Sequence, residues 1–387
     1  MHVMHVVGAR PNFVKVAPVM AALGRRSGTT QTLVHTGQHY DVEMSEVFFR
    51  QLGIPKPDIN LGVGSGSHAE QTARIMDRFE LVLLDRRPDL VLVYGDVNST
   101  LAAALVCTKS LVPLGHVESG LRSFDRSMPE EINRVLTDQV ADLLFTPSAD
   151  ADENLLREGR PRENIHRVGN VMIDTLVRCL EGANSSRILG QLRLCQGTDW
   201  QGLDSKVPRQ SATTSPYGLV TLHRPPNVDD HVTFSKIIKT LIDISRDLPV
   251  VFPVHPRTRK QITTLGLGDS ASQLRLLDPL GYVEFLALER VATFVITDSG
   301  GVQEETTYLG IPCLTVRQNT ERPVTVTLGT NTVVGNDMDR LRAEVHRILS
   351  GLPKRGQVPP LWDGKASERI ADILTGRSTH NLVLTGV

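Results

Sequence analysis

Short apolar runs alternate with longer helical stretches along most of this chain, and no other feature constrains its fold as strongly. A run such as VLVY, residues 91–94, is continuously apolar apart from its tyrosine hydroxyl. That composition is typical of strands in a parallel sheet covered on both faces. Strands that alternate with helices predict right-handed βαβ units. We therefore expect an α/β protein built from doubly wound parallel sheets.

The alternation is interrupted once, which predicts two domains. Residues 194–218 are rich in Ser, Thr, Gln, Gly and Pro and lack periodicity, as expected of a linker or variable surface segment. We expect an N-terminal Rossmann-like domain over residues 1–180, a linker over 181–216, a C-terminal Rossmann-like domain over 217–365, and a final helix and tail over 366–387 that packs back on the first domain. The two domains would face a central cleft, the default position of a ligand.

The predicted elements fall in both halves of the chain. Strands are expected at 2–8, 32–36, 89–94, 113–117, 143–146 and 165–168, and then at 219–222, 250–254, 275–277, 294–297, 313–316 and 332–334. Helices are expected at 12–25, 41–52, 68–86, 98–110, 130–141 and 148–158, and then at 231–246, 282–290, 301–308, 337–350 and 366–374.

Composition excludes several classes of protein. The chain has 387 residues and a net charge of −1, and only 4% of its residues are aromatic, so no nucleic-acid surface is expected. No apolar run approaches the roughly 18 residues that span a bilayer, and the N-terminus lacks the pattern of a signal peptide. The cysteines at 107, 179, 195 and 313 are scattered, which favours a reduced, cytoplasmic protein with no membrane partner.

Three carboxylates, Asp96, Glu118 and Glu130, occur at the ends of successive predicted strands or just beyond them. The carboxyl ends of strands form the ligand crevice of an open parallel sheet. An unpaired buried charge is costly, so carboxylates seldom gather there for packing alone. Their convergence predicts proton-transfer chemistry on an uncharged part of a substrate.

Two turns have features of phosphate-binding sites. The first, GARPN, follows the first strand and begins a helix, with Pro11 suited to the first helical position. Arg10 and Lys15 fall at the beginning of this helix, whose N-terminus already favours anions. The alternative is that both are ordinary surface cations.

The second turn is TDSGGVQEE, residues 297–305. Ser299 can donate its hydroxyl to a ligand and cap the helix, while Gly300 and Gly301 allow backbone N–H groups to cradle a diphosphate. Glu305 lies about one turn further along and could chelate a ribose diol. The alternative is a plain strand–turn–helix capped by Ser299.

Histidines follow two strands of the second half. His223, beside Arg224, follows GLVTL, and His255 follows VVFPV. A lone histidine is more often structural, but these equivalent strand ends favour phosphate contact. The sequence contains no HExxH and no compact pattern of metal ligands, so no metal is expected. The run at 62–67 lacks the last glycine and the preceding strand of a dinucleotide fingerprint, which argues against NAD.

A series of motifs between residues 8 and 323 resembles one known family over nearly the whole chain. They are GARPNFVKVAPV, HTGQHYD, YGDVNSTLAAALV, HVESGLRSFDRSMPEEINR, TLHRPPNVD, FPVHPRT and TDSGGVQEETTYLGIPCLTVRQNTERP. The chain resembles the non-hydrolysing UDP-N-acetylglucosamine 2-epimerases, which have a GT-B-type fold.

The resemblance implies reversible interconversion of UDP-N-acetylglucosamine and UDP-N-acetylmannosamine in a homodimeric enzyme without NAD, metal or another cofactor. The implied path is elimination of UDP to give 2-acetamidoglucal, followed by re-addition. The product would supply N-acetylmannosamine for surface polysaccharide synthesis. Departure of UDP leaves positive charge at carbon 1, which makes the carbon 2 proton removable by a carboxylate.

The resemblance also assigns roles by matching position. Asp96, Glu118 and Glu130 would be catalytic, with Asp96 favoured as the base and the division of labour left open. His223 would contact the diphosphate and assist UDP departure. The UDP-binding residues would be Arg10, Lys15, Phe285 near the uracil, Ser299, Gly300, Gly301, Glu305 and Arg322. Residues of a possible second site would be Gln38, His39, Arg224 and His255.

The chain departs from the family pattern at some positions, and three competing functions stay open. HRPPNVDD replaces an HRREN form, and Asp41 stands where relatives activated by their own substrate carry Gln, which argues against that activation. The runner-up is an epimerase for another UDP-sugar, such as a 2,3-diacetamido uronic acid. A retaining GT-B-type glycosyltransferase and a silent nucleotide-sugar binding protein are the second and third. GDVNST in place of a GDR-type motif disfavours a hydrolysing relative.

Overall fold

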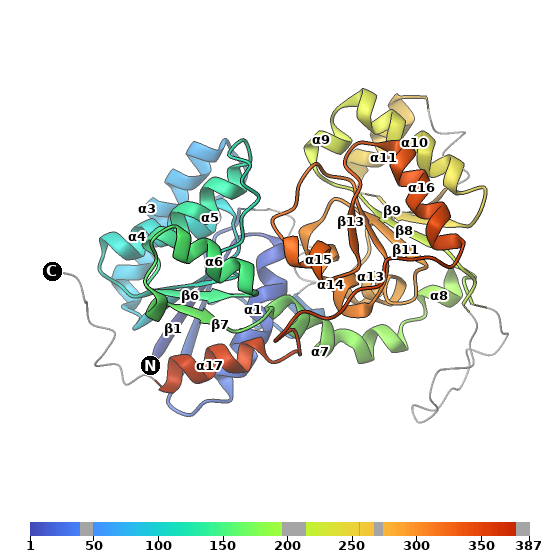
Figure 1. Ribbon diagram of the computed structural model, residues 1–387. Helices are drawn as coiled ribbons and strands as arrows, with labels where there is room; N and C mark the ends of the chain where they lie inside the picture. The colour runs from blue at the N-terminus through green and yellow to red at the C-terminus, as the bar shows by residue number, and fades with distance from the viewer. Residues whose placement is uncertain (39–48, 196–213, 255, 267–273, 377–387) are drawn as a thin grey trace. The chain divides into compact units, whose positions relative to one another are not determined.

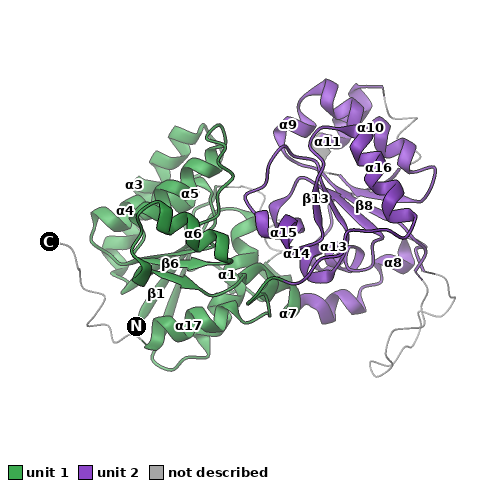
Figure 2. Ribbon diagram, viewed as in Figure 1, with its two compact units in different colours: residues 1–178, 359–387 green, residues 179–358 purple. Residues whose placement is uncertain are grey.

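The chain forms two compact units, each with its own parallel sheet. The computed structural model describes residues 1–38, 49–195, 214–254, 256–266 and 274–376. Unit 1 comprises residues 1–178 and 359–387, and unit 2 comprises residues 179–358 (Figure 2). The boundary falls within one helix, α7, at Val171–Ser185.

Unit 1 is built on a seven-stranded parallel sheet with strand order β3-β2-β1-β4-β5-β6-β7. Figure 1 labels β1, β6 and β7 of this sheet. Its strands are β1 His2–Val7, β2 Thr30–His35, β3 Ile59–Asn60, β4 Leu90–Tyr94, β5 Leu114–Val117, β6 Leu143–Thr146 and β7 Ile165–Arg167. Its helices are α1 Arg10–Gly24, α3 His68–Arg86, α4 Asn98–Lys109, α5 Pro129–Val140, α6 Ala149–Arg157, the short η1 Arg162–Asn164, the first part of α7, and α17 Ala366–Gly376. The strand order reverses between β1 and β4, where a doubly wound sheet opens its ligand crevice.

The core of unit 1 follows the alternation of side chains along each strand. Met4 and Val6 of β1 and Val91 and Val93 of β4 belong to one apolar cluster with Phe79 of α3. Burying a side chain of this size contributes roughly 1.5–3 kcal/mol. Helices α3, α4 and α5 pack side by side, whereas α1 packs against α17.

The C-terminal segment completes unit 1. Trp362 is buried and donates its indole N–H to the carbonyl of Pro147 at 2.9 Å. The N–H groups of Ala366 and Ser367, at the beginning of α17, donate to the carboxylate of Asp174 at 3.0 and 2.6 Å. A carboxylate from another helix therefore satisfies the first orphan donors of α17.

Unit 2 repeats the arrangement on a six-stranded parallel sheet with order β10-β9-β8-β11-β12-β13. Its strands are β8 Gly218–Thr221, β9 Val250–Pro253, β10 Arg275–Leu277, β11 Phe294–Thr297, β12 Cys313–Thr315 and β13 Asn331–Val333. Its helices are the end of α7, α8 Ile188–Gln191, α9 Pro225–Val228, α10 His231–Ile244, α11 Pro256–Thr264, α13 Tyr282–Glu289, α14 Gly300–Leu309, α15 Pro323–Thr327 and α16 Met338–Leu349. Its order reverses between β8 and β11.

Both faces of the second sheet are covered. Val220 and Ile296 belong to an apolar cluster with residues of α10 and α16, such as Leu241. Their neighbours Leu219 and Val295 belong to a second cluster on the opposite face, with residues of α8, α13 and α14. Covered faces explain why these strands read as continuous apolar runs in the sequence.

The observed elements differ from the expected ones in a few places. Helices α7, α9, α11 and α15 and strand β3 were not expected, and α7 with α8 occupies residues 171–191, so much of the expected linker start is helical. Residues 359–365 belong to unit 1, because Trp362 is buried there. The remainder of the expected linker (196–213), most of the expected helix at 41–52 and the tail at 377–387 lie outside the described residues. Within the described part of the chain, no helix is both long and apolar enough to cross a bilayer.

Candidate active site

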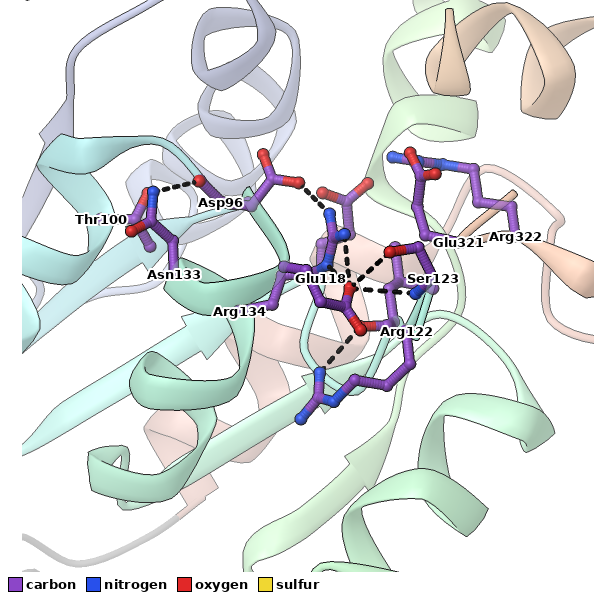
Figure 3. A network of polar contacts seen from close by, with 12 residues as sticks. Asp96, Thr100, Glu118, Arg122, Ser123, Asn133, Arg134, Glu321 and Arg322 are labelled. Atoms are coloured by element: carbon purple, nitrogen blue, oxygen red, sulfur yellow. Dashed lines mark hydrogen bonds and ion pairs between the residues drawn. The ribbon is translucent and has the colours of Figure 1, made fainter. Parts of the chain in front are cut away.

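Asp96 lies directly after β4, at the point where the strand order of unit 1 reverses. Its carboxylate pairs with the guanidinium group of Arg134 on α5, and its backbone carbonyl accepts a hydrogen bond from Asn133 Nδ2 at 2.9 Å (Figure 3). The Asp96 side chain is 22% exposed, whereas that of Arg134 is 2% exposed. The buried arginine therefore orients a carboxylate that remains accessible.

Glu118 follows β5 and forms a buried ion pair with Lys15 of α1. Both side chains are nearly inaccessible, which excludes the interpretation of Lys15 as a surface cation. A Cβ atom at Gly95 would lie 2.7 Å from Lys15 Nζ, so a glycine is required beside this pair. Glu118 itself has φ 73°, in the left-handed region. Such a backbone costs on the order of 1–3 kcal/mol for a residue with a side chain, and such strain is commonly found at functional sites.

Glu130 and its neighbour Glu131 are in different surroundings. Glu131 is buried and accepts hydrogen bonds from the N–H groups of Ser123 and Phe124 at 3.0 and 2.9 Å and from Arg134 Nη2 at 2.6 Å. Burial alone would raise the pKa of Glu131, but these hydrogen bonds and Arg134 hold it below its usual range. Glu130, in the first turn of α5, is half-buried. Glu131 is thus a structural anchor, and Glu130 is the accessible carboxylate of the two.

The turn after β1 differs from the expected anion cradle. The N–H groups of Gly8 and Ala9 both donate to Asn12 Oδ1, at 3.0 and 3.1 Å, and Asn12 Nδ2 donates to the carbonyl of Tyr94 at 2.7 Å. The turn is therefore satisfied by its own helix. Any contact with an anion here would be made by the half-buried side chain of Arg10.

The residues expected at a possible second site are only partly described. Gln38 is buried, and its Oε1 accepts hydrogen bonds from the N–H and hydroxyl groups of Ser99, at 3.1 and 2.7 Å. This ties the loop after β2 to the N-terminus of α4. His39 and His255 lie outside the described residues.

In unit 2, Asp298 organises the turn after β8. It is fully buried and accepts hydrogen bonds from the N–H groups of His223 and Arg224, at 3.1 and 3.0 Å, and from Asn227 Nδ2 at 3.0 Å. Burial would raise the pKa of Asp298, yet these donors and the His223 ring hold it below its usual range. The His223 side chain is 58% exposed, with Nδ1 at 3.1 Å from Asp298 Oδ1. Asp298 thus contacts Nδ1 of the imidazole, while the rest of the His223 ring is accessible.

Ser299 to Gly301 form the N-terminus of α14. Ser299 is the N-cap residue, but its side chain makes no capping hydrogen bond, contrary to the expectation from sequence. Its own N–H donates to Thr297 Oγ1 at 3.0 Å. A Cβ atom at Gly300 would lie 2.2 Å from Arg322 Nη1, so the glycine admits the guanidinium group to this helix end. Gly301 is half-buried in the same turn.

Arg322 belongs to a cluster of opposite charges that sequence reasoning mostly missed. Three guanidinium groups, of Arg224, Arg317 and Arg322, meet the two buried carboxylates of Glu304 and Glu321. With the neighbouring carboxylate of Asp298, which accepts the N–H of Arg224, the negative charges equal the positive ones. Guanidinium donors beside the N-terminus of α14 nevertheless favour an anion such as a diphosphate. The run RQNTER, residues 317–322, was the available signal, because its charges are spaced to meet after a turn.

Glu305 and Phe285 lie deeper in unit 2. Glu305 Oε1 accepts a hydrogen bond from the Tyr282 hydroxyl at 2.6 Å, and the carboxyl group of Glu289 faces it in the buried interior. Burial raises the pKa of Glu305 to about 7 and that of Glu289 well above its ordinary value. Phe285 is half-buried against the cluster that includes Leu189.

Sequence reasoning also missed the residues that hold the carboxylates of unit 1. Arg134 follows Glu130 by four positions and Glu131 by three, a helical spacing that indicates an ion pair. His116 and Asp138 are both fully buried, with Nδ1 and Oδ1 2.6 Å apart. They are separated by 22 residues, and no local pattern connects them.

Comparison with known proteins places the chain in a family and identifies its relatives. The model of the family described as UDP-N-acetylglucosamine 2-epimerase matches residues 21–375. The chain is 41% identical to the UDP-N-acetylglucosamine 2-epimerase of Methanocaldococcus jannaschii over 375 residues, covering 96% of this chain and 98% of that protein. It is 42% identical to the UDP-2,3-diacetamido-2,3-dideoxy-D-glucuronate 2-epimerase of Pseudomonas aeruginosa over 377 residues, covering 97% and 99%.

A solved structure agrees with these relatives. The crystal structure of the Methanocaldococcus jannaschii UDP-GlcNAc 2-epimerase in complex with UDP-GlcNAc and UDP matches with a TM-score of 0.85 and 39% sequence identity, covering 97% of this chain and 100% of that one. Two doubly wound units of this kind place the chain among the GT-B-type enzymes of nucleotide sugars. Within that class the chain belongs to the UDP-N-acetylglucosamine 2-epimerase family and is an epimerase.

Proposed function

We propose that this enzyme reversibly inverts carbon 2 of UDP-N-acetylglucosamine to give UDP-N-acetylmannosamine. The observation that carries the proposal is Asp96, a partly exposed carboxylate oriented by the buried Arg134 where the strand order reverses. Relatives of 41% identity and a matching structure that holds UDP-GlcNAc support the substrate.

The proposed reaction needs no oxidant, reductant or other co-reactant. The bond between carbon 1 and the diphosphate oxygen breaks, and its electrons leave with UDP. A carboxylate takes the carbon 2 proton, and the electrons of that bond form the carbon 1–carbon 2 double bond of 2-acetamidoglucal. Re-addition of UDP at carbon 1, with a proton delivered to the other face of carbon 2, gives the epimer. Positioned acid–base groups contribute roughly 10²–10⁴-fold to such steps.

The carboxylates of unit 1 divide this work in the proposal. Asp96 acts as the base, because Arg134 fixes its orientation while its side chain stays accessible. Glu118, held by Lys15, stabilises the positive charge that develops at carbon 1. Glu130, half-buried in the first turn of α5, relays protons.

In this proposal, unit 2 binds the nucleotide. The guanidinium groups around Arg322 and the N-terminus of α14, with Ser299, Gly300 and Gly301, would hold the diphosphate. Its negative charge grows as the carbon–oxygen bond breaks, so donors aimed at it act most strongly in the transition state. His223 presents an accessible ring beside these groups and would assist the departure.

A second candidate substrate has a specific observation in its favour. The Pseudomonas aeruginosa relative is named for a 2,3-diacetamido glucuronate and is as similar to this chain as the relatives named for UDP-N-acetylglucosamine. Inversion at carbon 2 is common to both substrates. The chemistry proposed above therefore stands for either, and the substituents at carbons 3 and 6 distinguish them.

Incubation with each UDP-sugar in deuterated water, followed by proton NMR, tests the proposal. We expect deuterium at carbon 2 and a manno-configured product from UDP-N-acetylglucosamine. Exchange only with the diacetamido uronate would replace the substrate and keep the chemistry. UDP released only when an acceptor sugar is added, with no carbon 2 exchange, would indicate a glycosyltransferase and overturn the proposal.

Three broader expectations belong to the same proposal. The product would supply N-acetylmannosamine for surface polysaccharide synthesis, and the enzyme would act in the cytoplasm as a homodimer. Sedimentation of the purified protein tests the last of these directly.

A further inference from the structure

His116 is fully buried in β5 and lies between two hydrogen-bond acceptors. Its Nε2 is 2.8 Å from the carbonyl oxygen of Gly95, and its Nδ1 is 2.6 Å from Asp138 Oδ1. A carbonyl oxygen only accepts, so Nε2 carries a proton. Burial alone would raise the pKa of Asp138, but His116 and Arg122 hold it below its usual range. Asp138 Oδ1 lies against the other ring nitrogen, so the ring joins the carbonyl of Gly95 to the carboxylate of Asp138.

Asp138 connects this histidine ring to a second turn. Its Oδ2 accepts a hydrogen bond from the N–H group of Gly120 at 3.0 Å and lies 2.7 Å from Arg122 Nη1. Arg122 is itself held by both carboxylate oxygens of Glu158, at 2.8 and 2.6 Å. Both oxygens of Asp138 and both ring nitrogens of His116 thus have partners, as buried polar groups require.

The two turns joined in this way are those that carry the catalytic candidates. Gly95 immediately precedes Asp96, and Gly120 follows Glu118 by two residues. Gly95, Glu118 and Gly120 have φ values of 63°, 73° and 80°. A Cβ atom at Gly120 would lie 2.4 Å from the carbonyl oxygen of Ala151, so no side chain fits at this position. Glycine adopts a positive φ readily, whereas Glu118 is strained, and such strain persists only where its surroundings hold it.

We propose that the buried His116–Asp138 pair is a positioning element that fixes the turns of Asp96 and Glu118 in one relative geometry. The catalytic consequence rests on the function proposed above. Neither His116 nor Asp138 is accessible to substrate, so both act through the two turns. A shift of about 1 Å in a reacting group can cost on the order of 10²-fold in rate.

The test compares His116→Asn, which cannot reach Gly95, with His116→Gln, whose amide can still donate to that carbonyl. The control is His5→Asn. His5 is also fully buried, in β1 of the same sheet, and its partners are Tyr94 Oη at 2.7 Å and Gln31 Oε1 at 2.9 Å, which lie in neither turn. We expect His116→Asn to lower kcat about 10²-fold with KM changed less than about twofold, and His116→Gln to recover about tenfold. His5→Asn should keep the wild-type kcat.

Hydrogen exchange separates this proposal from the assignment of the reaction. Amides in residues 95–99 and 118–122 should exchange faster in His116→Asn than in the wild type, and not in His5→Asn. Unchanged exchange in these segments would overturn the positioning role. So would equal kcat losses in the two Asn variants, or a loss confined to KM. If the wild-type protein exchanged no carbon 2 hydrogen, the proposed reaction would fail, while the amide exchange would still decide whether the His116–Asp138 pair holds the turns.

Discussion

The two units share one strand order and differ in the charges placed at its reversal point. In unit 1 this edge carries carboxylates held by single cations, such as Asp96 with Arg134 and Glu118 with Lys15. In unit 2 the same edge carries three arginines around two buried carboxylates, beside a helix N-terminus. One topology thus supports a site suited to moving protons and a site suited to holding an anion. The fold supplies the position, and the side chains supply the chemistry.

The largest effect should come from unit 1. Asp96→Asn keeps the size of the side chain and removes the base, so we expect carbon 2 exchange to fall about 10²–10⁴-fold. UDP affinity, measured by calorimetry, should change less than about twofold, because free UDP lacks the carbon 2 proton on which Asp96 is proposed to act. Asp89→Asn is the matched control: Asp89 precedes β4 and accepts the N–H of His2 at 2.6 Å at the opposite end of the same strand. Full exchange activity in Asp96→Asn would remove it from the role of base.

A smaller effect should come from unit 2, and on binding rather than on chemistry. Arg322→Lys keeps the charge but loses the planar fork that bridges Glu304 and Glu321. We expect UDP to bind about 10- to 100-fold more weakly, as for loss of a hydrogen bond to a charged group. Exchange at saturating substrate should fall less. Arg342→Lys, on the surface of α16, should leave binding unchanged. Unaltered UDP affinity in Arg322→Lys would show that the arginine cluster is structural only.

The smallest effect concerns the stability of unit 2 as a function of pH. Burial raises the pKa of Glu305 from its ordinary value of 4.5 to about 7, beside the buried Glu289. The folded state therefore binds more protons than the unfolded state, so this stability is present below pH 4.5 and is lost as pH rises through about 7. Glu289→Gln removes one buried carboxyl group and should make this loss of stability less steep. We expect its Tm near pH 8 to lie about 2–4 °C above the value that the slope of the wild type would give.

Thermal unfolding between about pH 5 and pH 8 measures the difference. Glu284→Gln, on the same helix at a half-buried position, serves as the control and should follow the wild-type curve. A Glu289→Gln curve that falls as steeply as that of the wild type would show that the pair does not carry this linkage.

The sequence predicted most strands of both sheets closely, because strands covered on two faces must be apolar and bounded by turns. VLVY, for example, becomes most of β4, Leu90–Tyr94. It did not predict α7, because this helix crosses the boundary between the units and its apolar residues do not form one simple stripe. Ser299 was expected to cap α14, but its side chain makes no capping hydrogen bond, and its own N–H donates to Thr297 Oγ1. That choice depends on how β11 meets the helix and not on local propensity.

By itself the sequence determined that two parallel α/β sheets form, that carboxylates follow the strands of the first and that a glycine-rich turn opens a helix in the second. These features follow from local apolar periodicity and from the order of residues along the chain. Only the tertiary structure decided which charges meet. Lys15 reaches Glu118 from 103 positions away, and Arg134 reaches Asp96 from 38. The His116–Asp138 pair likewise exists only because β5 and α5 pack together in the interior. A buried charge is stable only beside its partner, and packing of distant segments selects that partner.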